Sequence, residues 1–277
     1  MVFDLHSHSN CSDGILSPQA LVSRAKEKGV TVLALTDHDT IAGIEPARQA
    51  AADEGVTLVA GIEFSSRWGS REVHVLGLGL NTESPPLLEA IAQQQAARDT
   101  RAEAIGERLA RLGIPDALAG ARALAQGQVG RPHFAQYLVT IGRVKDEAAA
   151  FKKYLGAGKP ADVKFQWPEM TQAIRWIHAS DGIAVLAHPA KYPLTRTKRN
   201  ALIADFADAG GEAVEVISGR QTNDITEDLA KMAETHGLAA SCGSDFHRPD
   251  APWQELANFG NLPERCRPVW TLLGYPA

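Results

Sequence analysis

The stretch of sequence that decides the fold is FDLHSHSNCSD, residues 3–13. Successive side chains of an extended strand point to opposite faces, so His6 and His8 are predicted on the same face as Asp4. Two imidazoles in this arrangement can bind one metal ion, and Asp13 can return to it from the following turn. A His-x-His pair also occurs among ordinary surface residues. Whether His6 and His8 bind a metal ion therefore has to be judged from the residues elsewhere in the chain.

Further along the chain, short apolar runs repeatedly end in residues of the types that bind metals. These residues are His38 after the run 30–35, Glu63 after 56–62, His188 after 183–187, and Asp245 and His247 after 238–241, while His74 lies near the start of the run 72–80. In barrels, catalytic groups gather where the strands deliver their C-terminal ends. The pattern predicts a multinuclear metal site at one end of a barrel. Histidine and carboxylate ligands without cysteine suit zinc, manganese or iron.

Helical segments separate most of these runs, which favours parallel β/α units. Helices are predicted over 17–29, 41–54, 168–181, 197–209 and 222–236. Seven strands with these helices predict an α/β barrel related to the (β/α)8 type but one unit short. No convincing strand occurs over 84–165, where a long helical run and shorter pieces predict a lid-like helical insertion. The predicted organisation is therefore a barrel in two parts, 1–83 and 166–277, with an insertion domain over 84–165.

The composition of the 277-residue chain indicates which partners and which cellular compartment to expect. A net charge of −5 argues against electrostatic capture of long nucleic acid. The three cysteines have no C-x-x-C spacing, which fits a reducing compartment and argues against disulfides and thiolate metal sites. No apolar run is long enough for a membrane span, and the first residues do not read as a signal peptide. These features predict a cytoplasmic protein and leave its oligomeric state open.

The motifs together resemble those of the polymerase and histidinol phosphatase (PHP) superfamily. The matching motifs are His6-x-His8, Thr36-Asp37-His38-Asp39, Glu63, His74, His188-Pro189 and Asp245-x-His247. They cover the barrel segments, about 1–83 and 166–250. The resemblance implies a distorted seven-stranded barrel with two or three divalent metal ions per chain. Mn²⁺ is the expected metal, with Zn²⁺ and Fe²⁺ as alternatives.

The resemblance also implies how the ligands are divided among the ions. The first ion takes His6, His8, Glu63 and Asp245; the second shares Glu63 and takes His74 and His188; the third takes Asp13, His38 and His247. Some relatives carry histidine at the position of Asp13. The aspartate adds a negative charge to the third site.

Within the superfamily, the chain most resembles a small bacterial branch that hydrolyses nucleoside 3',5'-bisphosphates such as adenosine 3',5'-bisphosphate. The features behind this narrower resemblance are the insertion with Arg131-Pro132-His133 and the segments 188–192 and 215–220. The implied reaction is removal of the 3'-phosphate by a metal-bridging hydroxide, with Glu63, Asp245 and His247 as the catalytic candidates. Related members degrade short oligoribonucleotides from the 5' end, and this activity is the main competing function.

A second phosphate on the substrate needs charge-assisted donors. The candidates are Arg131, Lys191 and Arg220, with His133 and Asn223 as further residues that could face the substrate. The alternative for each is an ordinary surface residue. Three more functions stay open: a histidinol-phosphate phosphatase, a metal-dependent amidohydrolase and a non-catalytic metal-stabilised scaffold. The complete ligand set favours catalysis. The role of residues 251–277 stays open as well, with Trp253 and Trp270 expected as packing anchors.

Overall fold

The computed structural model describes residues 1–164 and 167–276 and contains one sheet whose strands follow chain order. The strands are β1 (Phe3–Asp4), β2 (Val32–Leu35), β3 (Thr57–Trp68), β4 (Arg71–Leu78), β5 (Ile183–Leu186), β6 (Ala213–Ser218) and β7 (Ala239–Gly243). The prediction of a seven-stranded α/β barrel is confirmed. The predicted parallel pairing is confirmed for β1–β2, β2–β3, β5–β6 and β6–β7, whereas β4, which no helix separates from β3, runs antiparallel to both β3 and β5. The cause is a tight hairpin at Gly69, whose φ of +59° suits a two-residue turn between β3 and β4.

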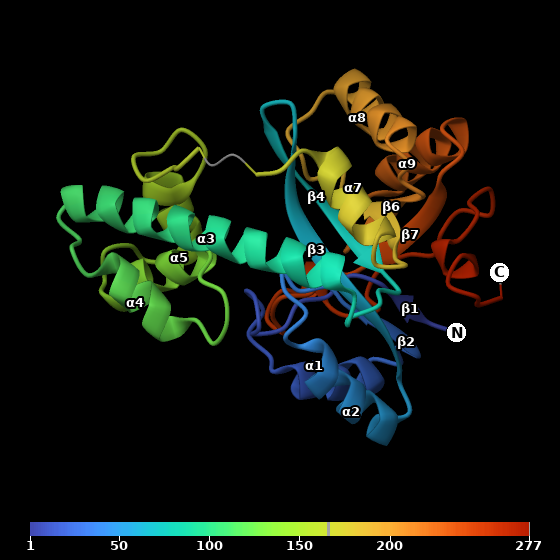
Figure 1. The fold of residues 1–277 in the computed structure, drawn as a ribbon, viewed down its shortest axis with the longest axis horizontal. Coiled ribbons are helices and arrows are strands. Elements are labelled where there is room, and N and C mark those ends of the chain that lie inside the picture. Colours follow the sequence, from blue (N-terminus) through green and yellow to red (C-terminus); the bar gives the residue numbers. More distant parts are fainter. Residues whose placement is uncertain (165–166, 277) are drawn as a thin grey trace.

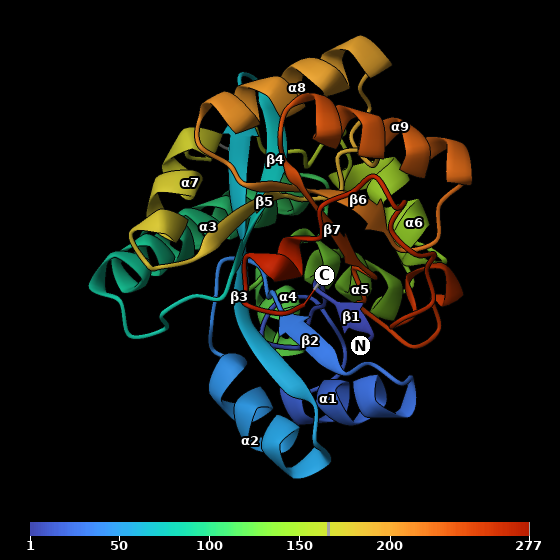
Figure 2. The same cartoon turned by 90° about the vertical axis from the view of Figure 1, so that its right-hand side faces the viewer.

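Five helices of the barrel segments lie around the outside of the sheet (Figures 1 and 2). They are α1 (Pro18–Glu27), α2 (Ile44–Glu54), α7 (Met170–His178), α8 (Arg196–Asp208) and α9 (Asn223–Thr235). Helix α1 begins as its sequence predicts. The Ser17 hydroxyl caps the helix by accepting a hydrogen bond from the Ala20 amide, and Pro18 occupies the first turn. Within the described residues, no helix combines the length and the apolar character that a membrane crossing requires.

The predicted insertion is helical and projects to one side of the sheet (Figure 1). Its elements are α3 (Pro85–Arg111), α4 (Ala117–Leu124), α5 (Arg131–Thr140), α6 (Glu147–Ala150) and a π-helical turn, Phe151–Leu155. The first turns of α3 bury Leu87 in the core of the barrel. The later turns bury Leu109 in a second core whose buried residues all lie within 102–163. The predicted boundary between 165 and 166 lies outside the described residues, and the exact domain division remains a prediction.

The barrel almost closes between its first and last strands. The Leu5 amide donates to the Cys242 carbonyl (3.1 Å), the Asp245 amide to the His6 carbonyl (2.9 Å), and the His8 amide to the Phe246 carbonyl (2.9 Å). These hydrogen bonds continue the pairing beyond the short β1. They carry the His-x-His segment alongside the residues that follow β7.

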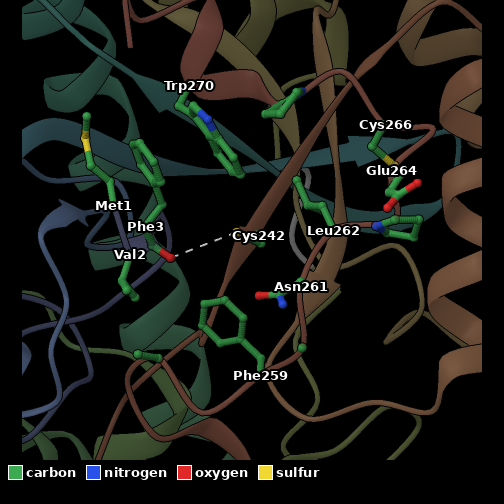
Figure 3. Close-up of a pocket in the computed structure, with 14 residues that line it drawn as sticks. Met1, Val2, Phe3, Cys242, Phe259, Asn261, Leu262, Glu264, Cys266 and Trp270 are labelled. Carbon is green, nitrogen blue, oxygen red and sulfur yellow. Dashed lines mark hydrogen bonds between the residues drawn. The ribbon is translucent and has the colours of Figure 1, made fainter. Parts of the chain in front are cut away.

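The C-terminal segment packs against the start of β1. Trp270 stacks on Phe3 with ring centroids 4.3 Å apart, as expected of a packing anchor. The same expectation for Trp253 is wrong, because that residue is 59% exposed. A pocket of about 580 Å³ lies between Met1–Phe3 and the segment around Leu262 (Figure 3). None of its lining residues is a predicted site residue, so this pocket is separate from the predicted metal centre.

Candidate metal centre

The His-x-His pair meets the residue at the end of β7. His6 Nε2 and His8 Nε2 lie 3.0 Å apart, which confirms that both imidazoles face the same side. Glu63 Oε2 lies 3.3 Å from each of these nitrogens. Asp245 Oδ1 lies 3.4 Å from His6 Nε2 and 3.2 Å from His8 Nε2. Two imidazoles and two carboxylates therefore converge on one point.

Glu63 also joins this group to two further histidines. His74 Nδ1 and His188 Nε2 each lie 2.9 Å from Glu63 Oε1. The expectation that Glu63 ends its strand is wrong, because it lies within the twelve-residue β3. The antiparallel β4 pairs Ser65 with His74, so the hairpin returns His74 to the level of Glu63.

The remaining candidates gather beside His8. Asp13 Oδ1 lies 3.2 Å from His247 Nε2, and Asp13 Oδ2 lies 3.6 Å from His38 Nε2. His8 Nδ1 is 3.9 Å from Asp13, and His38 Nδ1 is 3.0 Å from Glu63. The structure thus brings all nine predicted ligands into one cluster. Their division among separate ions remains a prediction, since His8 and His38 each border two groups.

Three residues of the cluster region adopt left-handed backbone conformations without being glycine. The φ values are +52° for Asp39, +30° for His188 and +55° for Asp245. Such conformations cost of order 1–3 kcal/mol each and persist where the surrounding structure imposes them. Asp39, His188 and Asp245 follow the ends of β2, β5 and β7. His188 and Asp245 are themselves predicted ligands.

Burial and neighbouring charges act in opposite directions on the acidic groups. Burial raises the pKa of the Glu63 carboxyl, but His38, His74 and His6 outweigh it and hold that pKa well below its usual range. Burial likewise opposes ionisation of Asp245, yet Lys191 and His6 keep its pKa well below normal. The carboxylates of the cluster are therefore ionised at neutral pH, as metal binding requires.

The imidazole nitrogens and carboxylate oxygens of the cluster are of the types that bind a cation. The Glu215 carboxylate accepts a hydrogen bond from His6 Nδ1 (2.9 Å), so a His6 ring that has exchanged its Nε2 proton for a metal ion would direct the Nε2 lone pair into the cluster. Several fully buried cluster atoms have no hydrogen-bond partner, namely His8 Nδ1, His38 Nδ1, His188 Nδ1 and Glu63 Oε2. Buried polar atoms of this kind are costly unless something else satisfies them. Divalent metal ions match these converging imidazoles and carboxylates.

Sequence reasoning did not assign a role to Glu215. Its side chain is 1% exposed and lies on β6, where Oε1 accepts from His6 and Oε2 accepts from the His188 amide (2.6 Å). It thereby fixes two predicted ligands on different strands. Glu215 is the only acidic residue in the apolar run 213–217, and this is the signal that could have identified it.

Arg98 was also missed, because a single arginine in a long helix carries no sequence signal. Its Nε donates to Asp39 Oδ2 (2.7 Å), and its Nη2 donates to the Ser65 hydroxyl (2.9 Å). Gln94, one turn earlier on α3, donates to Asp39 Oδ1 and to the Ser65 carbonyl, both at 2.7 Å. The insertion is therefore fastened to the barrel directly beside His38.

The five predicted substrate-binding residues fall in two different places. His133 is buried within electrostatic range of Asp13, and Lys191 donates to Asp245 (2.5 Å), so these two border the cluster. Arg131 pairs with Glu72 (3.3 Å), which lies two residues before His74 on β4. Arg220 and Asn223 instead line a separate pocket of about 270 Å³ beside the C-terminal segment. The assignment of all five to the substrate remains a prediction.

Metal removal is expected to lower the melting temperature. A metal present at 100 times its Kd stabilises the folded state by about 2.7 kcal/mol, and 1 kcal/mol corresponds to roughly 2–4 °C for a domain of this size. Dialysis against a chelator should therefore lower Tm by about 5–10 °C, measured by differential scanning calorimetry, and added Mn²⁺ should restore it. An unchanged Tm after metal analysis has confirmed removal would contradict the assignment.

Comparison with known proteins identifies relatives of this chain. A family model described as "PHP domain" matches residues 4–99. The chain is 46% identical over 268 residues to a 5'-3' exoribonuclease of Haemophilus influenzae, covering 97% of each protein. It is 40% identical to a 3',5'-nucleoside bisphosphate phosphatase of Chromobacterium violaceum, covering 96% of this chain and 94% of the relative.

A solved structure from Chromobacterium violaceum has the same overall fold. It is described as an amidohydrolase with bound sulfate and no metal. The TM-score is 0.92 at 40% identity, over 99% of this chain and 96% of that one. That description names the competing amidohydrolase class, whereas both sequence relatives are named for cleavage of phosphate esters.

Proposed function

Because this chain belongs to the PHP domain family and is a metal-dependent phosphoesterase, we propose that it removes the 3'-phosphate of nucleoside 3',5'-bisphosphates. The reaction breaks the P–O3' bond: an oxygen from water bonds to phosphorus, and O3' leaves with a proton. The 40% identical bisphosphate phosphatase supports this choice of substrate. The nine clustered histidines and carboxylates support the chemistry.

The ligand cluster has a defined task in this proposal. His6, His8, Glu63 and Asp245, together with His74, His188, Asp13, His38 and His247, would hold divalent ions, with Mn²⁺ as the proposed metal. Such ions lower the pKa of water and neutralise phosphoryl oxygens. Glu63 lies in contact distance of both the His6–His8 pair and the His74–His188 pair, so it fixes the spacing of the cluster. Lys191 adds a cation beside Asp245, where it can contact a phosphoryl oxygen.

The observation that carries the bisphosphate assignment is a cationic group held by β4. Glu72 pairs through separate oxygens with Arg101 (2.8 Å) and Arg131 (3.3 Å), both from the insertion. Glu72 and His74 are two residues apart on one strand, so both side chains project from the same face. Arg131 is 33% exposed and therefore accessible to a second phosphate next to the metal cluster.

Replacing Arg131 by glutamine tests this assignment. Loss of a charge-assisted hydrogen bond of about 1.5–3 kcal/mol should raise KM for adenosine 3',5'-bisphosphate about 10- to 100-fold. KM for adenosine 3'-monophosphate, which lacks the second phosphate, should change little. Phosphate release by the manganese-loaded enzyme measures both. Arg48→Gln, a surface residue paired with Glu45, is the matched control. Equal effects on the two substrates would remove Arg131 from phosphate recognition.

A second candidate is hydrolysis of short oligoribonucleotides from the 5' end. It is favoured by the 46% identical relative that is named a 5'-3' exoribonuclease. The two reactions break the same bond, because a 5'-phosphorylated oligoribonucleotide is a nucleoside 3',5'-bisphosphate whose 3'-phosphate carries a further nucleoside. One metal cluster can therefore serve both substrates, provided that the chain has room for the additional nucleoside.

A further inference from the structure

The exposed Trp253 lies in the loop that follows the last ligands. Of the aromatic side chains in residues 1–164 and 167–276, only that of Trp253 falls among the exposed large apolar ones, at 59% exposure. Water-exposed indole is unfavourable by the hydrophobic effect, and aromatic side chains at such positions are enriched in binding surfaces. Packing does not explain this tryptophan, so its neighbours have to indicate its role.

On one side, Trp253 is connected to the metal cluster. The next residue, Gln254, donates from Nε2 to the Asp245 carbonyl (2.8 Å) and to Asp245 Oδ2 (3.1 Å). Asp245 Oδ1 is the atom that faces His6 and His8. A single peptide unit therefore separates Trp253 from a residue that holds a predicted ligand.

Through its backbone, Trp253 is also connected to residues that line the polar pocket of about 270 Å³, which contains Arg220 and Asn223. The Arg220 amide donates to the Trp253 carbonyl (2.8 Å), and Asn258, which also lines the pocket, donates to the Pro252 carbonyl (2.9 Å). The close approach depends on Gly219, since a Cβ there would lie 2.7 Å from the Trp253 carbonyl oxygen. The loop is thus fixed between the metal cluster and this pocket.

We propose that Trp253 and the pocket beside it bind the nucleoside that follows the scissile phosphate in an oligoribonucleotide. This inference rests on the proposed function. The base stacks on the indole, which accepts any base because every base has a π-face. The Arg220 guanidinium, exposed at the pocket, suits the next phosphate along the strand. Arg131 belongs to the insertion, whereas the loop of Trp253 is bonded to Arg220 after β6 and to Asp245 after β7, so the oligoribonucleotide would cross the metal cluster between them.

The test compares two substrates that share the scissile bond. Adenosine 3',5'-bisphosphate lacks the downstream nucleoside, whereas the 5'-phosphorylated dinucleotide pApA carries it. Because stacking of one base on an aromatic side chain is worth about 5- to 100-fold, Trp253→Ala should lower the ratio of kcat/KM for pApA to that for the bisphosphate at least fivefold. Trp253→Phe retains an aromatic face and should recover most of this ratio.

Leu88→Ala is the control, because Leu88 is an exposed apolar residue (49%) on α3 that touches neither the pocket nor the cluster. It should leave the ratio unchanged. An unchanged ratio in Trp253→Ala would overturn the proposed subsite. Should the wild-type enzyme hydrolyse neither substrate, the proposed function is wrong. Equal affinities of wild type and Trp253→Ala for pApA in calorimetry would then overturn the subsite independently of turnover.

Discussion

Replacing Glu63 by alanine is expected to reduce phosphate release by about 10³-fold or more, because this one carboxylate lies in both ligand groups and would hold the ions whose charge would stabilise the transition state. Glu63 is fully buried and lies within 3.3 Å of His6, His8, His38, His74 and His188. Its loss should also lower the bound metal, measured by plasma emission spectroscopy on the purified protein. His6→Ala should act in the same direction.

Loss of activity has to be separated from loss of fold. Far-UV circular dichroism should show an intact fold for Glu63→Ala, since no core apolar contact is removed. Glu63→Gln keeps the side-chain volume and provides a second variant if alanine proves unstable. Glu45→Ala, an exposed glutamate on α2 (77%), is the control and should retain both metal and turnover. Full activity in either Glu63 variant would eliminate the proposed metal centre.

Replacing Glu215 by glutamine is expected to weaken metal binding about 10- to 100-fold, the usual effect of losing a residue that orients a metal-binding histidine. The carboxylate accepts two hydrogen bonds, from His6 Nδ1 and from the His188 amide. Glutamine has a single acceptor oxygen, so its NH2 group would oppose one of these two donors. The measurement is metal affinity by competition with a chromophoric chelator, which reports on the site without turnover.

Glu212→Gln is the matched control. Glu212 precedes the same strand, accepts a hydrogen bond from the Ala184 amide and pairs with His178 (2.9 Å), away from the predicted ligands. It should leave the metal affinity unchanged. Equal affinities of Glu215→Gln and wild type would show that His6 and His188 are held in place without this carboxylate.

The sequence predicted the site correctly where residues that commonly bind metals recur directly after apolar runs. Ligand-type residues after apolar runs predicted the cluster, and His6 and His8 meet as the period-2 geometry of a strand requires. The same reasoning placed Glu63 wrongly. The residues after Ile62 continue β3 into a hairpin, and nothing in the local pattern distinguishes a strand that ends from one that turns back six residues later.

The residues that sequence reasoning missed are defined by tertiary contacts. Glu215 acts through ligands 209 and 27 residues away, and Arg98 reaches Asp39 across 59 residues. Trp253 was expected to be a packing anchor, and tryptophan is on average a well-buried residue. Only the hydrogen bonds of the neighbouring Gln254, Arg220 and Asn258 show that this loop is held at the surface.

The helix α3 contributes residues to both hydrophobic cores. The orientation of the insertion relative to the predicted metal ligands therefore depends on the number of residues in this helix. Its 27 residues are anchored to the barrel through Gln94 and Arg98 and to the insertion core from Ala102 onward. A single residue added between Arg98 and Ala102 would rotate the insertion by about 100° and shift it by about 1.5 Å. Arg131 and His133 would then move away from the metal cluster although every predicted ligand stayed in place. We therefore expect insertions or deletions between Arg98 and Ala102 to preserve the site only when they add or remove close to a whole number of helical turns.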